Sequence, residues 1–399
     1  MTESLQTTDG PLPAPQSPDG IAHHVIEHAV AVQSRILDRL RRWVELESPS
    51  GDEAAAIALA AEIGRAFQDA GAVVEYVPAP GWGQHVLARF PGRDPSLPPV
   101  VVLGHLDTVH PRGTLESQPF QIVGDRAEGP GIYDMKAGVA VLAEIFDLFR
   151  ETGTLPTRPV VALITCDEEE GSISSRALIE ETARGAEAVL VLEPPLRGGG
   201  AKTMRKGVAV YTLRIHGRPS HAGLEPEKGV SAILELAHQL VHISGLAAPE
   251  RGTTINAGVI GGGTASNVVP AEAWAEIDVR FTSMREFERV DAALRALQAV
   301  VAGATLEIEG GCNRPPLERS EGVIRLYERA RTIAEELGFD LPEGAAGGGS
   351  DGNFTAALGV PTLDGLGVQG DGAHATDEHI LIADLPRRTA LLGRLLETL

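Results

Sequence analysis

Three short runs of almost unbroken apolar residues constrain the fold of this chain more than any other feature. They cover residues 100–103, 160–165 and 188–192. A strand that is apolar along its whole length is typical of a parallel sheet with helices on both faces. Helical periodicity is found at 21–46, 53–70, 136–151 and 174–184, and shorter β-rich runs at 73–77 and 85–90. This alternation predicts an α/β domain with a mostly parallel central sheet.

The pattern changes in the second half of the chain. Strands are expected over residues 208–216, 253–260, 272–281 and 304–309, with helices over 228–244 and 286–302. This β-α-β-β-α-β order predicts a ferredoxin-like α+β domain inserted into the larger domain. We expect a disordered Pro/Ser/Asp/Gln-rich tail at 1–20, a main domain formed by 21–206 and 315–399, and an inserted domain at 207–314.

Composition excludes several classes of partner. With 34 basic and 55 acidic residues the formal net charge is −21, and such a field repels nucleic-acid phosphates and anionic membrane surfaces. The two cysteines cannot form a disulfide framework. No apolar run reaches the roughly 20 residues of a membrane-spanning helix, and the first residues lack the basic start and apolar stretch of a signal peptide. We therefore expect a cytoplasmic protein that binds neither nucleic acid nor membranes.

The end of the first apolar run carries His105 and Asp107. Open α/β sheets bind their ligands at the carboxyl ends of the strands, and residues two apart on an extended chain point to the same face. A carboxylate beside an imidazole fixes its tautomer and makes it a better metal ligand. A strand-end histidine with a capping aspartate is the simpler interpretation, and this pattern alone leaves both open.

Further acidic and histidine positions follow the same logic. Asp134 precedes a helix, where N-capping is the ordinary role of aspartate. The acidic run at 167–170 follows a buried strand. A divalent cation would offset its repulsion there, and a carboxylate left uncoordinated could act as a general base. A solvated charge run is the alternative. Glu193 ends the third apolar run, and His374 lies in a Gly-rich loop. Two histidines and three carboxylates can hold two metal ions about 3.5–4 Å apart, which suits zinc.

The order of these motifs resembles the aminoacylase and glutamate carboxypeptidase family of co-catalytic di-zinc metallopeptidases. The resemblance extends over residues 25–399 and rests on five motifs. They are Gly-His-Leu-Asp-Thr-Val at 104–109, Gly-Ile-Tyr-Asp-Met-Lys-Ala-Gly at 131–138, Asp-Glu-Glu-Glu-Gly-Ser at 167–172, Arg-Pro-Ser-His-Ala-Gly at 218–223 and Gly-Thr-Ala-Ser-Asn-Val-Val-Pro at 263–270. Met135 departs from the Asp or Asn of many relatives, and only the residue before it is a ligand in the family.

The resemblance implies a metal site with two zinc ions per chain, or cobalt or manganese in their place. Asp134 would bridge the two ions, and Glu168 would be the general base. Asp107 would orient His105. The remaining ligands would be His105 and Glu193 on one ion, and Glu169 and His374 on the other. Relatives also hold the peptide bond between residues 134 and 135 cis.

The resemblance implies substrate-binding residues as well. His221, in the inserted domain, resembles the residue that reaches the active site of the partner subunit and polarises the scissile carbonyl, which implies a homodimer formed through that domain. Asn267 and Arg280 match positions that bind the substrate's carboxylate. Looser matches are Arg314 and Lys202, and Gly349 lies in a loop, 347–351, that resembles one whose backbone faces the carboxylate.

The implied activity is hydrolysis of an amide bond next to a C-terminal amino acid, in a peptide or an N-acyl amino acid. Glu193 favours removal of a C-terminal amino acid, or of an N-acyl group from one, because carboxypeptidase and deacylase relatives usually carry Glu there and aminopeptidase and dipeptidase relatives carry Asp. A glutamate carboxypeptidase is the first choice. The alternative is an N-acyl amino acid deacylase, such as an acetylornithine deacetylase or a succinyl-diaminopimelate desuccinylase. From other classes, an inactive metal-stabilised binding protein is disfavoured by Glu168, and a two-metal phosphoesterase by the lack of excess basic residues around the motifs. Cys166 is interpreted as a buried strand residue, and His110 and His379 as structural residues that could lie near the site.

Overall fold

A computed structural model describes residues 20–399, so the tail predicted at 1–20 lies outside the described residues except for its last position. The chain divides into two compact units. The larger unit contains the residues up to Thr203 together with Arg319–Gly344 and Leu358–Leu399, and the smaller unit contains Met204–Glu318 and Ala345–Ala357. Among the described residues, no helix combines the length and the apolar character needed to cross a membrane.

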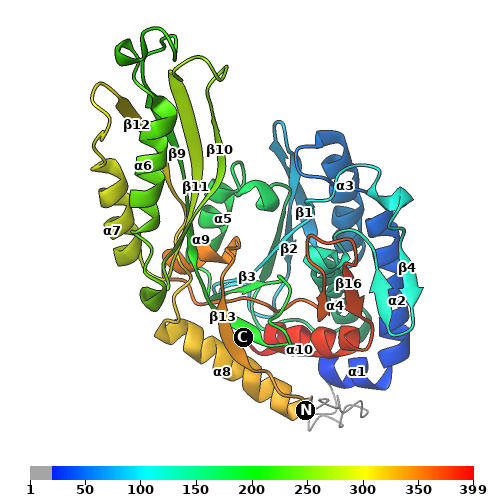
Figure 1. Cartoon of the computed structure of the whole chain (residues 1–399). Coiled ribbons are helices and arrows are strands. Elements are labelled where there is room, and N and C mark those ends of the chain that lie inside the picture. The colour runs from blue at the N-terminus through cyan, green and yellow to red at the C-terminus, as the bar shows by residue number, and fades with distance from the viewer. Residues whose placement is uncertain (1–19) are drawn as a thin grey trace, which may run out of the picture. The chain divides into compact units, whose positions relative to one another are not determined.

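The larger unit is built on a six-stranded sheet with the order β1-β2-β6-β3-β7-β14 (Figure 1). Strands β6, β3, β7 and β14 pair in parallel, whereas β2 is antiparallel to both of its neighbours. Strand β3 is buried at every position, as its continuous apolar sequence predicts. The bounds are Val73–Ala79 (β1), Gly83–Phe90 (β2), Val100–His105 (β3), Val160–Thr165 (β6), Ala188–Val191 (β7) and Thr362–Leu363 (β14).

Helices pack around this sheet, and most residues of α4 and α10 are buried. Helix α4 contacts β3 and the helices α2, α3 and α10, and the ring of its Phe146 stacks on Phe90 of β2 with centroids 4.6 Å apart. The single helix predicted at 21–46 is wrong, because His28 leaves the helical region at φ −116°, ψ 26° and separates two helices. The bounds are Ile21–Glu27 (α1), Ala29–Glu45 (α2), Glu53–Asp69 (α3), Ala137–Thr152 (α4), Arg176–Ala183 (α5), Glu321–Glu336 (α8) and Asp384–Thr398 (α10).

A small antiparallel sheet, which the sequence did not predict, connects distant parts of the larger unit. Its order is β15-β16-β5-β4, and its strands have only two or three residues, too few to show a hydrophobic period. It places β16 against β5, so the residues before β16 lie beside the residues that follow β5. The bounds are Gln121–Val123 (β4), Arg126–Glu128 (β5), Gly370–Asp371 (β15) and His379–Leu381 (β16). A further pair joins β8 (Ala201–Arg205) to β13 (Glu343–Ala346).

The smaller unit has the predicted β-α-β-β-α-β order, β9-α6-β10-β11-α7-β12. Its four strands form an antiparallel sheet with the order β10-β11-β9-β12, and α6 and α7 pack against it (Figure 1). This is the arrangement expected of a ferredoxin-like domain. The bounds are Gly207–His216 (β9), Ala232–Ser244 (α6), Thr254–Gly262 (β10), Glu272–Phe281 (β11), Met284–Arg295 (α7) and Thr305–Arg314 (β12).

One helix of the smaller unit is shorter than expected. The helix predicted at 286–302 ends at Arg295, because the buried carboxylate of Glu235 accepts the backbone N–H groups of Val300 and Val301 and holds that segment in a loop. The segment Ala345–Ala357, which carries α9 (Gly352–Ala357), belongs to this unit and not to the larger one. Within it, the Asn353 amide donates to the backbone oxygens of residues 206 and 315. The boundaries 21–206, 315–399 and 207–314 stay a prediction for the folding domains.

Candidate active site

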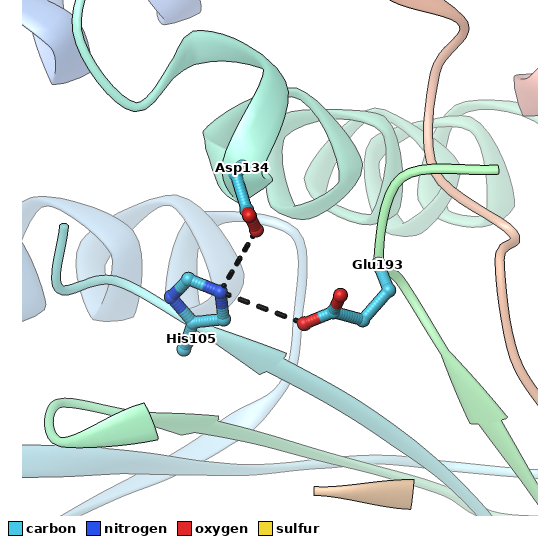
Figure 2. Close-up of side chains that lie close together, drawn as sticks. All are labelled: His105, Asp134 and Glu193. Carbon is cyan, nitrogen blue, oxygen red and sulfur yellow. Dashed lines mark hydrogen bonds and ion pairs between the residues drawn. The ribbon is translucent and has the colours of Figure 1, made fainter. Parts of the chain in front are cut away.

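Three side chains from separate parts of the larger unit meet beside the end of β3. His105 is the last residue of β3, Asp134 lies in the irregular segment Ile132–Lys136 that leads into α4, and Glu193 follows β7. The Nε2 atom of His105 is 3.2 Å from Asp134 Oδ1 and 3.7 Å from Glu193 Oε1 (Figure 2). One donor atom from each residue lies within 4.8 Å of the other two, a spacing that could hold a metal ion.

A second group contains the other oxygen of the same aspartate. His374 Nε2 lies 3.5 Å from Asp134 Oδ2 and 3.2 Å from Glu169 Oε2, and donor atoms of these three residues again lie within 4.8 Å of one another. His374 has a positive φ of 64°, an uncommon conformation for a residue other than glycine. Because each group uses a different oxygen of Asp134, this carboxylate is positioned to bridge two ions.

Burial and hydrogen bonds shift the pKa values of the clustered side chains in opposite directions. Burial lowers the pKa of His105, but its hydrogen bonds to Asp107 and Asp134 outweigh burial and hold that pKa well above its usual range. Hydrogen bonds to Asp134 and Glu169 raise the pKa of His374 to about 10. Burial raises the pKa of Asp134, but hydrogen bonds from His105 and His374 outweigh it and leave the pKa below its usual range. Burial also raises the pKa of Glu169.

These residues fit a pair of divalent cations. Buried carboxylates that crowd together need counter-charge, which divalent cations supply in sites built from imidazole and carboxylate ligands. Glu169 Oε1 is buried and has no hydrogen-bond partner, and a buried polar atom of this kind is satisfied when it becomes a metal ligand. Imidazole and carboxylate donors suit zinc and also suit cobalt or manganese.

Asp107 organises the residues behind this cluster. The Nδ1 atom of His105 is 3.0 Å from the backbone carbonyl of Asp107, and since a carbonyl can only accept, Nδ1 carries the proton and Nε2 is left to face the cluster. The carboxylate of Asp107 accepts the backbone N–H groups of Glu168 and Glu169 at 3.2 Å each, and the hydroxyl of Ser50 at 2.7 Å. Asp107 therefore fixes His105 through its main-chain carbonyl and the acidic turn after β6 through its carboxylate. Glu168 is half-buried in that turn.

The smaller unit contains most of the residues expected to bind substrate. His221 is exposed, and its Nδ1 accepts the backbone N–H groups of Gly223 and Leu224, at 3.1 and 3.2 Å. The proton of the neutral ring is therefore on Nε2, which can donate a hydrogen bond. Asn267 is exposed in the adjacent loop, where its backbone carbonyl accepts the N–H of Ala222.

Both arginines of this unit that were expected to bind substrate already make ion pairs. Arg280, on β11, makes a bidentate ion pair with Asp278 through Nε and a second guanidinium nitrogen, with contacts of 2.8–3.1 Å. Arg314 is buried, pairs with Asp351 at 2.9 Å, and lies over the ring of Phe354. Arg205, which sequence reasoning missed, donates to the carbonyls of Gly348 and Gly349 and so holds the Gly-rich loop.

The larger unit contains the last of the predicted residues and some that were missed. Lys202 is buried on β8, and its backbone pairs with Asp364. The Asp134–Met135 peptide bond is cis, as expected. Cys166 is buried, as expected. Ser50 and Glu378 were missed because they contact Asp107 and the backbone of Asp134 across 57 and 244 residues, and no local motif marks either.

The family of the chain is decided by comparison with known proteins. The model of the peptidase family M20/M25/M40 matches residues 101–398. The chain belongs to this family. Among curated relatives, carboxypeptidase G2 of Pseudomonas sp. (strain RS-16) is 30% identical over 379 residues, which cover 93% of this chain and 91% of that protein. Succinyl-diaminopimelate desuccinylase of Xanthomonas euvesicatoria pv. vesicatoria (strain 85-10) is 30% identical over 324 residues, 76% of this chain and 84% of that protein.

Solved structures of other family members share the fold. Aminopeptidase PepT from Bacillus cereus ATCC 10987 has a TM-score of 0.76 and 25% identity, and the match covers 92% of this chain and 98% of that chain. As a member of the M20 peptidase family, this protein is a hydrolytic enzyme with two candidate metal-binding groups. It is therefore not the inactive metal-stabilised binding protein of the alternative interpretation.

Proposed function

We propose that this enzyme is a two-zinc hydrolase that cleaves an amide bond next to a C-terminal amino acid, with a glutamate carboxypeptidase activity as the first choice. The observation that carries the proposal is the Asp134 carboxylate, whose two oxygens each face a separate histidine and glutamate. The proposed ligands are His105 and Glu193 for one ion, Glu169 and His374 for the other, and Asp134 for both. Bound divalent cations would make water acidic enough to attack near neutral pH and would polarise the scissile carbonyl.

In this proposal Glu168 moves the proton. It is half-buried, and its backbone is fixed by Asp107 next to the ligand Glu169. Its carboxylate accepts a proton from the attacking water and then donates it to the nitrogen of the amide as the C–N bond breaks. A residue with this role is not a metal ligand. Because Glu169 belongs to a metal-binding group and Glu168 does not, we assign ligation to Glu169 and proton transfer to Glu168.

His221 would stabilise the negative charge that develops on the carbonyl oxygen. Backbone N–H groups occupy its Nδ1, so Nε2–H is available as a donor. We propose that it acts on the metal site of the partner subunit in a homodimer. Asn267 and Arg280 would bind the carboxylate end of the substrate, with Arg314, Lys202 and the loop at Gly349 in lesser roles.

The proposed dimer forms through β10 and α6 of the smaller unit. β10 is an edge strand of its sheet, and exposed edges and apolar patches favour association. Ile260 of β10 and Val241 of α6 are 63% and 76% exposed, respectively. A reducing, cytoplasmic location stays part of the proposal, because both cysteines are free thiols.

We expect the variant Ile260→Lys to be monomeric, since an ammonium group on the edge strand cannot be buried in a self-association surface. Sedimentation velocity would show wild type with twice the mass of this variant. Val73→Lys, at a residue of the larger unit that is 72% exposed, is the matched control and should sediment as wild type. A wild-type enzyme that is monomeric and fully active at assay concentrations would contradict the dimer.

Substrate preference is tested by removing and restoring the metal. Chelated enzyme should lose all activity against an N-acyl glutamate and regain it when zinc is added. The relative carboxypeptidase G2 supports a carboxypeptidase activity, and the desuccinylases support the alternative of an N-acyl amino acid deacylase. Faster turnover of N-succinyl-diaminopimelate or N-acetylornithine would favour that alternative. Turnover of a phosphate ester in place of all amides would indicate a two-metal phosphoesterase.

A further inference from the structure

Glu378 is a buried carboxylate that the proposed mechanism does not use. It lies just before β16 and is 2% exposed. Its Oε2 atom accepts the backbone N–H of Gly131 at 2.8 Å, and Oε1 accepts those of Tyr133 and Asp134 at 2.8 and 3.0 Å. The carboxylate thus receives a hydrogen bond from the main chain of the residue whose side chain is shared by the two metal-binding groups.

The segment held by Glu378 has little regular structure of its own. Gly131 has a φ of 70°, and Asp134 lies outside the helical region at φ −116°, ψ 92°. Backbone N–H groups ahead of a helix have no acceptors within it, and buried donors need a partner. Glu378 supplies that partner for three of the four residues at 131–134.

A histidine also contacts this carboxylate. His110 Nε2 is 2.6 Å from Glu378 Oε2, and the His110 side chain is 10% exposed. Asp107 lies three residues before His110 in the same chain segment. His374 lies four residues before Glu378, in the loop that precedes it. Glu378 therefore connects the three loops on which Asp107, Asp134 and His374 lie.

We propose that Glu378 is a positioning residue of the metal centre. It fixes the main chain at 131–134 and thereby directs the Asp134 carboxylate toward both metal-binding groups, and His110 keeps the Glu378 side chain in place. This inference rests on the proposed two-metal function and adds to it a residue that binds neither metal nor substrate. Glu378 acts through the main chain of Asp134, so its removal changes metal binding and not proton transfer.

The test compares Glu378→Gln with wild type. The glutamine has the same shape, but its NH₂ group cannot accept the N–H bonds that one carboxylate oxygen now receives. Zinc affinity is measured by chelator competition on the metal-free proteins, and the visible spectrum is recorded after cobalt is added. We expect a 10–100-fold loss of affinity for at least one ion, the usual effect of removing a partner of a ligand, and an altered cobalt spectrum.

Two variants complete the experiment. The control is Glu128→Gln. Glu128 lies on β5, beside β16, is half-buried and accepts a hydrogen bond from Gln121. This variant should match wild type in zinc affinity and cobalt spectrum. His110→Gln leaves the carboxylate and its three N–H bonds in place. It should show a smaller loss of zinc affinity, and it replaces Glu378→Gln in the comparison with wild type if that variant does not fold.

The outcomes separate this inference from the function on which it rests. If wild type binds two ions and the Glu378 variant binds them with wild-type affinity and spectrum, the positioning role is wrong and the metal centre stands. A lower unfolding temperature of the metal-free variant with unchanged affinity would show a purely structural role and overturn the proposal in the same way. If wild type does not bind two ions, both the function and this inference fail.

Discussion

The variant Glu168→Gln should lose about 10²–10⁴-fold in kcat, the usual contribution of a general acid–base catalyst, and should still bind two metal ions per chain. An amide nitrogen cannot accept the proton of the attacking water, whereas the main-chain bond from residue 168 to Asp107 is unaffected by the change. Turnover of an N-acyl glutamate and metal content by elemental analysis would check both parts.

The neighbouring residue provides the matched control. Glu169→Gln removes the ligand whose Oε2 lies 3.2 Å from His374, so this variant should lose one metal ion and its activity. If Glu168→Gln loses the ion and Glu169→Gln keeps both, the roles of the two glutamates are reversed.

The second large effect concerns His221. His221→Ala should lower kcat by about 10²–10³-fold, the typical cost of one donor to a developing oxyanion, with intact metal content. Because we propose that this donor serves the partner's site, mixing His221→Ala with Glu168→Gln under conditions of subunit exchange should restore part of the activity. In a mixed dimer, one site has Glu168 and receives an intact His221 from the other chain.

The control for this experiment mixes two variants of the same site. Glu168→Gln with Glu169→Gln should stay inactive, since neither chain then supplies a complete metal site with its base. If the first mixture also stays inactive although exchange is verified by labelled subunits, His221 does not act across the interface.

Much of the fold follows from local sequence because its elements are long and their patterns simple. The apolar runs at 100–103, 160–165 and 188–192 correspond to β3, β6 and β7, since strands buried on both faces leave a continuous apolar signature. Element boundaries that depend on residues distant in sequence are not predictable from local patterns. The end of α7 at Arg295 depends on Glu235, and helical periodicity cannot reveal a carboxylate that caps a loop from another helix.

The same distinction holds at the candidate site. Residues at strand ends, such as His105 and Glu193, are recognisable because the topology brings those ends together. The sharing of Asp134 between two groups was expected only through the family resemblance, since its local pattern is that of an ordinary N-cap. Glu378 has no local signal at all, because its three backbone partners lie 244–247 residues away.

The central claim is that Asp134 bridges two metal ions, and anomalous diffraction from crystals of the zinc-loaded enzyme at the zinc absorption edge tests it most directly. The account predicts two peaks about 3.5–4 Å apart, one beside His105 and Glu193 and the other beside Glu169 and His374, with the Asp134 carboxylate between them. A single peak, or two peaks that do not share Asp134, would contradict it.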